Sequence, residues 1–133
     1  MTRRAVSTSA APPAAGPYSQ AITTDDFVFC AGQIGRDPAS GTMPEGVEAQ
    51  TAQVLKNLLA VLDAAGCTFA DVVKTTCFLA DINDFAAFNG VYETFMSDPP
   101  PARSTFQVGA LPMGARVEIE AIARRVAVDA VAR

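Results

Sequence analysis

The sequence has no histidine and no tryptophan among its 133 residues. Without imidazole, the chain cannot build a catalytic pair in which histidine activates a serine or cysteine nucleophile. Cysteine is scarce as well: Cys30, Cys67 and Cys77 stand far apart, with no C-x-x-C spacing. A zinc site would need all three thiolates and a carboxylate, so we predict no metal. The odd cysteine count favours thiols in a reducing compartment over a disulfide framework.

An excess of positive charge is also missing. Ten lysines and arginines face fourteen aspartates and glutamates, for a net charge of −4. The only paired basic residues are Arg3-Arg4 and Arg124-Arg125. Nucleic-acid-binding proteins carry a basic patch, so we predict no nucleic-acid partner and argue against a ribonuclease. An arginine pocket aimed at a small anion remains compatible with this composition.

Long apolar runs are absent too. No run approaches the roughly 18 residues of a membrane span, so we predict no membrane partner. The first residues, MTRRAVSTSAAPPAAG, lack the apolar block of a secretory signal, and we expect a cytoplasmic protein. This stretch bears arginine and serine with no acid before Asp25, which faintly resembles a transit peptide. We favour a flexible Ala/Pro arm over residues 1–15.

The pattern that is present predicts one domain over residues 1–133. Apolar residues recur at three- and four-residue spacing over 46–65, and Gly66 is placed to end that helix. A second helix follows Asp81–Asp84 and runs to about Met96, before the prolines at 99–101. A short extended segment is expected at 16–22, strands at 26–35, 71–80, 102–109 and 116–126, and a frayed tail over 127–133.

This order predicts an α+β fold, one mixed sheet covered on one face by two helices. The short loop before the last strand predicts that the last two strands form a hairpin or are close neighbours. In the last strand one face is apolar, while the other mixes Glu118, Glu120, Ile122 and Arg124. Half of all residues are hydrophobic. Both features predict contact with another subunit and a pocket at the seam.

Four side chains of the last two predicted strands are candidates for chemistry. Arg103 follows Pro-Pro-Pro-Ala at the start of a strand, and its planar fork suits a carboxylate. Spacing alone favours a surface arginine paired with an acid. Glu118 and Glu120 lie about 7 Å apart on one strand face. Either one of them pairs with an arginine while the other handles protons, or both face solvent. Thr105 shares the strand face of Arg103.

Four segments carry a resemblance to a known family. They occur in order over residues 16–125 and read GPYSQA, CAGQIGRDPASG, DVVKTTCFLADINDFAAFNGVYETF and PPARSTFQVGALPMGARVEIEAIA. The chain resembles the reactive intermediate deaminase family (RidA/YjgF-type, also called the endoribonuclease L-PSP group). The resemblance implies a chorismate-mutase-like fold and a homotrimer with pockets in the clefts between subunits. It implies hydrolysis of 2-imino acids and enamines to 2-keto acids and ammonia, with no cofactor. Examples of such substrates are iminobutyrate and the iminopropionate that forms from 2-aminoacrylate.

The resemblance also assigns residues. Arg103 matches the arginine that clamps the substrate carboxylate, and Glu118 matches the glutamate that orients water. Tyr18 and Asn89 match pocket residues. The remaining pocket-lining positions are Cys30, Ala31 and Gly32.

Two positions depart from the family pattern. Thr105 stands where the enamine deaminases commonly have cysteine, and Ala31 stands where serine is frequent. Both changes leave the anchor intact and bear on substrate and rate. Two alternatives follow: a pathway-specific deaminase of a larger imine, and a non-enzymatic regulatory trimer that binds small carboxylates through Arg103 alone.

Overall fold

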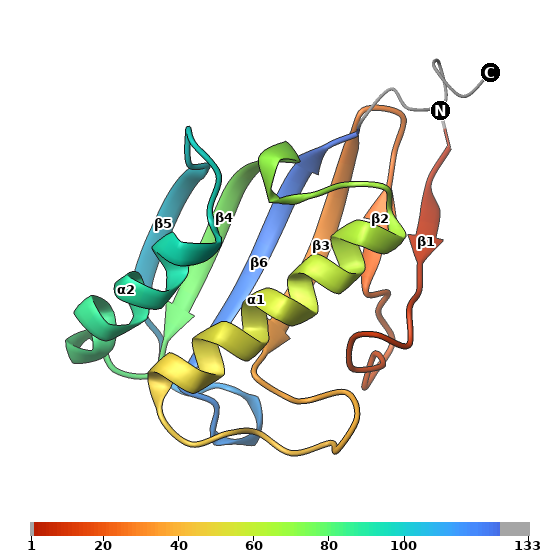
Figure 1. Ribbon diagram of the computed structural model, residues 1–133. Helices are drawn as coiled ribbons and strands as arrows, with labels where there is room; N and C mark the ends of the chain where they lie inside the picture. The colour runs from red at the N-terminus through yellow and green to blue at the C-terminus, as the bar shows by residue number, and fades with distance from the viewer. Residues whose placement is uncertain (1, 126–133) are drawn as a thin grey trace.

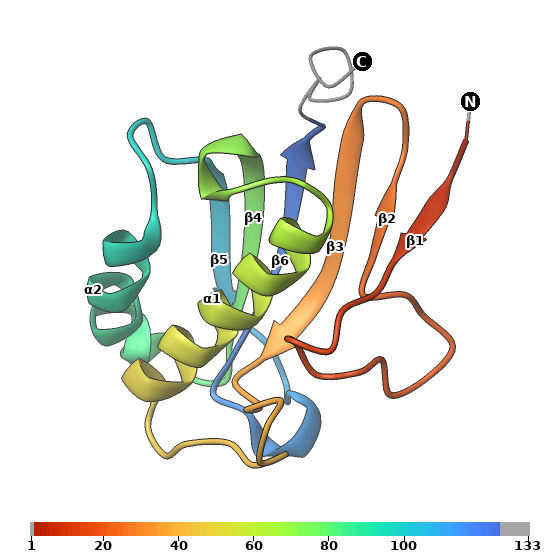
Figure 2. The same cartoon turned by 45° about the vertical axis from the view of Figure 1, so that its right-hand side comes forward.

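Two helices cover one face of a six-stranded sheet in the computed structural model, which describes residues 2–125 (Figure 1). The helices are α1 (Val47–Ala64) and α2 (Phe85–Phe95). The strands are β1 (Arg4–Val6), β2 (Ala21–Thr23), β3 (Phe27–Ile34), β4 (Val72–Leu79), β5 (Ala102–Gln107) and β6 (Val117–Arg124). Both helices lie on the same side of the sheet in the turned view as well (Figure 2). The α+β class and the two-helix layer predicted from the sequence are confirmed.

The strand order is β1-β2-β3-β6-β4-β5. The edge pair β4 and β5 is parallel and the other pairs are antiparallel, so the sheet is mixed. The predicted hairpin between the last two strands is wrong, because β4 lies between β5 and β6. The chain passes through α2 between β4 and β5, and such a crossover is what joins parallel neighbours. This crossover brings α2 over the edge strand that carries Arg103.

The N-terminal segment belongs to the sheet, which corrects the expectation of a flexible arm over residues 1–15. β1 pairs with β2, and the Gln20 side chain forms hydrogen bonds with the loop that follows β1. Its Oε1 accepts from the Thr8 amide at 2.7 Å, and its Nε2 donates to the Pro12 carbonyl at 2.8 Å. One buried side-chain amide thus provides hydrogen-bond partners for the Thr8 N–H and the Pro12 carbonyl, which lie outside regular secondary structure. The predicted frayed tail over 127–133 lies outside the described residues.

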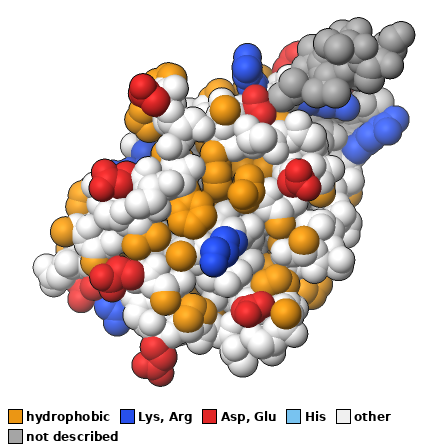
Figure 3. All heavy atoms as spheres, viewed as in Figure 1, with side chains coloured by type: hydrophobic (Ala, Val, Ile, Leu, Met, Phe, Trp, Pro, Cys, Tyr) orange, Lys and Arg blue, Asp and Glu red, His pale blue; other side chains and the backbone are white. Residues whose placement is uncertain are grey.

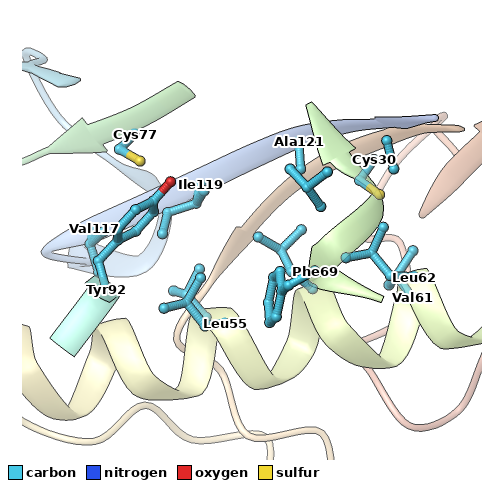
Figure 4. Packing of buried hydrophobic residues seen from close by; sticks show 14 of the residues in the cluster. Cys30, Leu55, Val61, Leu62, Phe69, Cys77, Tyr92, Val117, Ile119 and Ala121 are labelled. Carbon is cyan, nitrogen blue, oxygen red and sulfur yellow. The ribbon is translucent and has the colours of Figure 1, made fainter. Parts of the chain in front are cut away.

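The core fills the layer between α1 and the sheet. Five apolar residues of α1 are fully buried: Val54, Leu55, Leu58, Val61 and Leu62. Figure 4 shows Leu55, Val61 and Leu62 directed at the strands that carry Ile119, Ala121 and Cys30. α1 ends where Gly66 adopts a φ of 79°, a left-handed conformation that glycine takes without steric cost. Packing on α1 therefore fixes which face of β6 is buried, and its two glutamates lie on the opposite face.

That opposite face of the sheet is uncovered in the single chain. Phe27 and Phe29 of β3 and Phe106 of β5 each keep between 41% and 45% of their surface exposed. The rings of Phe78 and Phe106 meet edge to face at 5.3 Å. Exposed aromatic patches of this kind are typical of contact surfaces. None of the described helices has the length and apolarity needed to cross a membrane.

Candidate active site

Arg103 lies on the edge strand β5, directed toward α2. It pairs in register with Thr75 of β4, which is buried beneath the helices. Side chains at paired positions share a sheet face, so Arg103 points to the helix-covered side. Its Nη1 donates a hydrogen bond of 2.7 Å to Oδ1 of Asn89 in α2. The structure therefore brings together two of the residues predicted to bind substrate.

Three aromatic rings of α2 surround the guanidinium of Arg103. Its Cζ lies 4.7 Å from the ring centre of Tyr92, 5.5 Å from that of Phe85 and 5.6 Å from that of Phe88. Their spacing of three and four residues places all three rings on one side of the helix. Cation–π contacts contribute roughly 0.5–1 kcal/mol each at exposed sites and about 2 kcal/mol when desolvated. We call Phe85, Phe88 and Tyr92 the aromatic cage.

A hollow of about 470 Å³ opens beside the guanidinium. Asn89 and Tyr92 line it on the helix side, and Ser97, Pro100 and Pro101 line it on the side of the loop that leads into β5. The prolines have no N–H to offer, so Arg103 supplies the positive charge of this wall, while Glu93 adds a negative charge on the helix side. An anion that enters this hollow meets a guanidinium that is already oriented.

Glu118 is the centre of a second half-site, on β6. A β-bulge in β3 falls between Cys30 and Gln33, beside this glutamate. A Cβ added to Gly32 would lie 2.1 Å from Oε2 of Glu118, so the carboxylate occupies the space that any other residue would fill. Burial raises the pKa of Glu118 above its ordinary value, and the nearby Glu120 carboxylate raises it further. Glu118 thus holds a proton at higher pH than an ordinary glutamate.

A hollow of about 560 Å³ receives this carboxylate. Tyr18, Ala31, Gly32 and Glu120 line it together with Glu118. The Tyr18 hydroxyl accepts a hydrogen bond of 3.2 Å from the Ala15 amide, which leaves its own proton free to be donated. The turn that begins at Gly16 holds the ring outward, with 53% of the residue exposed. The structure therefore places Tyr18, Ala31 and Gly32 with Glu118, as expected for one pocket wall.

The two half-sites of one chain lie on opposite faces of the sheet. Phe78 of β4 pairs with both Phe106 and Glu118, which assigns Glu118 to the uncovered face. Thr75 pairs with Arg103 on the helix-covered face. A short ligand cannot reach through a sheet to touch both groups. The structure brings Asn89 to Arg103, and Tyr18 to Glu118, but it does not bring Arg103 to Glu118 within one chain.

Two further predicted residues have mixed outcomes. Thr105 pairs with Cys77 on the side of Arg103, and its Oγ1 is buried without a hydrogen-bond partner among the described residues. Cys30 borders a hollow beside Tyr18, but its side chain is part of the core beneath α1 (Figure 4). Burial raises the pKa of the Cys30 thiol to about 12, so this thiol stays protonated. Its contribution to a pocket is therefore structural.

Sequence reasoning missed the role of the aromatic cage. Phe85, Phe88 and Tyr92 follow the helical period of core residues, and that period gives no sign that they meet a cation. It also missed Met113, which lines the hollow of Glu118 with a positive φ of 57°. Among residues 2–125, no group of three or more His, Cys, Asp or Glu side chains is gathered that could hold a metal ion.

Comparisons with known proteins identify the family to which the chain belongs. The family model described as Endoribonuclease L-PSP matches residues 8–125. A 2-iminobutanoate/2-iminopropanoate deaminase of Rattus norvegicus is 54% identical over 122 residues, covering 91% of this chain and 89% of the relative. The Homo sapiens protein of that name is 52% identical over 124 residues, covering 92% and 90%. The crystal structure of E. coli TdcF with bound serine has a TM-score of 0.88 at 40% identity, covering 92% of this chain and 99% of that one. The chain belongs to the reactive intermediate deaminase family, whose family model bears the description Endoribonuclease L-PSP.

Proposed function

We propose that this protein hydrolyses 2-imino acids and their enamine tautomers, such as 2-iminopropanoate and 2-iminobutanoate, to 2-keto acids and ammonia. The observation that carries the proposal is the presence of two different charged groups. The Arg103 guanidinium lies against the aromatic cage, and Glu118 is a half-buried carboxylate whose pKa is raised. The first suits a carboxylate, and the second suits proton transfer. The relatives named 2-iminobutanoate/2-iminopropanoate deaminase support the substrate class. The serine bound to E. coli TdcF is a small carboxylate, which supports a ligand of that kind here.

We propose that the active unit is a homotrimer with a chorismate-mutase-like arrangement, in which Arg103 of one subunit and Glu118 of the next face a shared cleft. The placement of these residues on opposite sheet faces supports this arrangement. A second copy is needed to present the missing half. The exposed phenylalanines of the uncovered face supply an apolar surface for that copy.

The reaction needs only modest activation, because an imine carbon is already an electrophile. Arg103 binds the carboxylate and so orients C2 of the imine toward water. Water adds to C2, the C=N electron pair moves to nitrogen, and Glu118 takes the water proton and returns it to that nitrogen. Glu118 then takes the O–H proton of the resulting 2-amino-2-hydroxy acid and delivers it to the amino nitrogen, so the C–N bond breaks, ammonia leaves and C=O forms. General acid–base help of this kind contributes about 10²–10⁴-fold.

The other pocket residues serve these two groups. Asn89 fixes the Arg103 guanidinium, and the Tyr18 hydroxyl donates to the substrate or to water. Thr105 supports β5 from its buried side, where it pairs in register with Cys77. Ala31 and Gly32 shape the wall around Glu118, and Cys30 backs that wall from the core.

A nuclease activity finds less support in the charges. On the helix side, the described lysines and arginines are scattered among acidic and apolar side chains (Figure 3). Phosphate backbones are bound by clustered positive charge. Cys30 and Cys77 are thiols, which supports a reducing compartment such as the cytoplasm.

The proposal is tested by coupling the protein to an amino-acid oxidase that releases 2-iminobutanoate, with semicarbazide trapping the surviving imine. The wild type should suppress semicarbazone formation, while Arg103→Ala and Glu118→Gln should not. Lys56→Ala is the matched control, since this exposed cation on α1 lies on the helix side and lines neither hollow. If the wild type leaves the semicarbazone yield unchanged for every short imino acid, deamination of small imines is refuted. Binding of 2-oxobutanoate without turnover would point to the carboxylate-binding trimer, and turnover of a bulkier imine to the pathway-specific enzyme.

A further inference from the structure

Tyr92 joins the helix over Arg103 to the strand beside it. Its hydroxyl and Oγ1 of Thr75 lie 2.7 Å apart in a buried hydrogen bond. Thr75 belongs to β4 and pairs in register with Arg103 on β5. One hydrogen bond therefore ties the ring that lies nearest the guanidinium to the strand that positions the arginine.

We infer that Tyr92, held by Thr75, is a positioning residue that fixes the Arg103 guanidinium in the orientation that binds the substrate carboxylate. The inference rests on the proposed function in that Arg103 is taken as the anchor. The ring of Tyr92 lines the hollow beside Arg103, and its positioning role is exerted through the arginine.

The geometry leaves the binding edge of the guanidinium open. The N–H donors of arginine all lie in the plane of the group, and aromatic rings take its face. Asn89 occupies Nη1, while the ring centre of Tyr92 lies 4.7 Å from Cζ. Between them they fix the plane and one edge. The remaining donors are available to the hollow beside Pro100 and Pro101.

The hydroxyl of Tyr92 is as important as its ring. Tyr92 is 4% exposed and Thr75 is 1% exposed, so neither hydroxyl has water as an alternative partner. The ring also contacts Phe88, at 5.4 Å between centres, which prevents sideways movement. A phenylalanine at this position would keep the cation–π face but remove the Tyr92–Thr75 hydrogen bond, so the Thr75 hydroxyl would keep only the long contact of 4.0 Å from the Cys77 thiol and the ring would be free to tilt.

The test uses the full-length protein with Tyr92→Leu, Tyr92→Phe and Thr75→Val. Kinetics on 2-iminobutanoate give KM and kcat, calorimetry gives the Kd of 2-oxobutanoate, and thermal unfolding gives Tm. For Tyr92→Leu we expect KM and Kd to rise about tenfold or more with kcat changed by less than about threefold, because the anchor contributes equally to ground and transition states. Tyr92→Phe and Thr75→Val should each raise KM by roughly two- to fivefold, and their double variant no more than either alone.

Phe95→Leu is the matched control. Phe95 lies one turn further along α2, packs edge to face on Phe69 at 6.3 Å and belongs to no contact with Arg103 among the described residues. It should lower Tm as Tyr92→Leu does and leave KM unchanged. An equal rise of KM in Phe95→Leu, or a wild-type KM in Tyr92→Leu, would overturn the inference. If Tyr92→Leu does not fold, the Phe and Val variants decide it alone.

A readout without substrate separates this inference from the proposed function. Ligand-free crystal structures should show the Arg103–Asn89 hydrogen bond in the wild type and its loss, or a reoriented guanidinium, in Tyr92→Leu and Tyr92→Phe. An unmoved guanidinium in these variants overturns the positioning role even if the protein proves to be a deaminase. A wild type inactive on imines refutes the proposed function, while the crystallographic comparison still decides the positioning role.

Discussion

The Arg103 half-site and the Glu118 half-site hold their charges in opposite ways. The cation is fixed by direct contacts, with an amide on Nη1 and three rings around its face. The anion is placed by backbone shape, in the space left by the bare Cα of Gly32 beside a bulge. A substrate anchor must keep one orientation, whereas a group that moves protons must change its charge. On the proposed function, rigidity is therefore concentrated on the group that binds the substrate and pKa tuning on the group that moves protons.

The largest effect is expected when the side chain at position 103 keeps its positive charge but loses the planar shape of the guanidinium. Arg103→Lys retains the cation, but an ammonium cannot present a planar fork or lie flat on the aromatic cage. We expect kcat/KM for 2-iminobutanoate to fall at least about 100-fold, measured in the semicarbazide competition. A fall of less than about threefold would show that charge alone anchors the carboxylate.

Glu118→Gln tests the other side, with an effect mainly on kcat. The amide keeps the size of the carboxyl group and cannot carry the proton, so kcat should drop about 10²–10⁴-fold while KM changes little. A parallel rise in KM would assign Glu118 to binding instead.

The same variant should also change stability with pH. Because the folded-state pKa of Glu118 is raised, the folded state binds more protons than the unfolded state between the two pKa values. Stability from this group is therefore present below the unfolded pKa and lost as pH rises through the folded one. Glu118→Gln removes that loss, so its Tm should exceed that of the wild type by a few degrees at neutral pH and match it in acid. A lower Tm at neutral pH would contradict this sign.

Gly32→Ala sharpens the claim that Glu118 is placed by shape. The added methyl group would overlap Oε2 of Glu118, so the carboxylate must move. We expect kcat to fall about tenfold or more with Arg103-dependent binding of 2-oxobutanoate retained. The matched control is Gly90→Ala in α2, where a Cβ meets nothing within 4 Å. That control should keep full activity and gain roughly 0.5–1 kcal/mol of stability from better helix propensity.

This contrast also explains which parts of the structure can be predicted from the sequence. The period of two in β6 separates its buried face from Glu118 and Glu120, and the helical period places α1 and α2, because these patterns report burial directly. The role of Tyr92 is hidden by the same rule, since a residue on the apolar side of a helix looks like core. Only the crossover that brings α2 over β5 turns it into a neighbour of Arg103.

Other features depend on contacts that no local pattern reports. The place of β4 between β5 and β6 follows from long-range strand pairing. The loop after β1 is held in its conformation by hydrogen bonds from the Gln20 side chain. The separation of Arg103 and Glu118 onto two faces required the register of three strands. The family resemblance pointed to both residues, and strand register places them on opposite sheet faces of one chain.

Glu120→Gln carries the smallest expected effect and tests pKa tuning alone. Glu120 shares the face and the hollow of Glu118, and its charge adds to the burial that raises the Glu118 pKa. Tyr18 and Arg36 face the same hollow from the other elements and are unchanged in this variant. Removing the negative charge should lower the pKa of Glu118, so the rise of kcat/KM with pH should move to lower pH while the plateau stays near the wild-type value. Glu48→Gln, in the first turn of α1, is the control for a generic change in net charge. Equal shifts in both variants, or a shift to higher pH, would show that Glu118 is not tuned by its neighbour, and the contrast between a fixed cation and a tuned anion would then rest on burial alone.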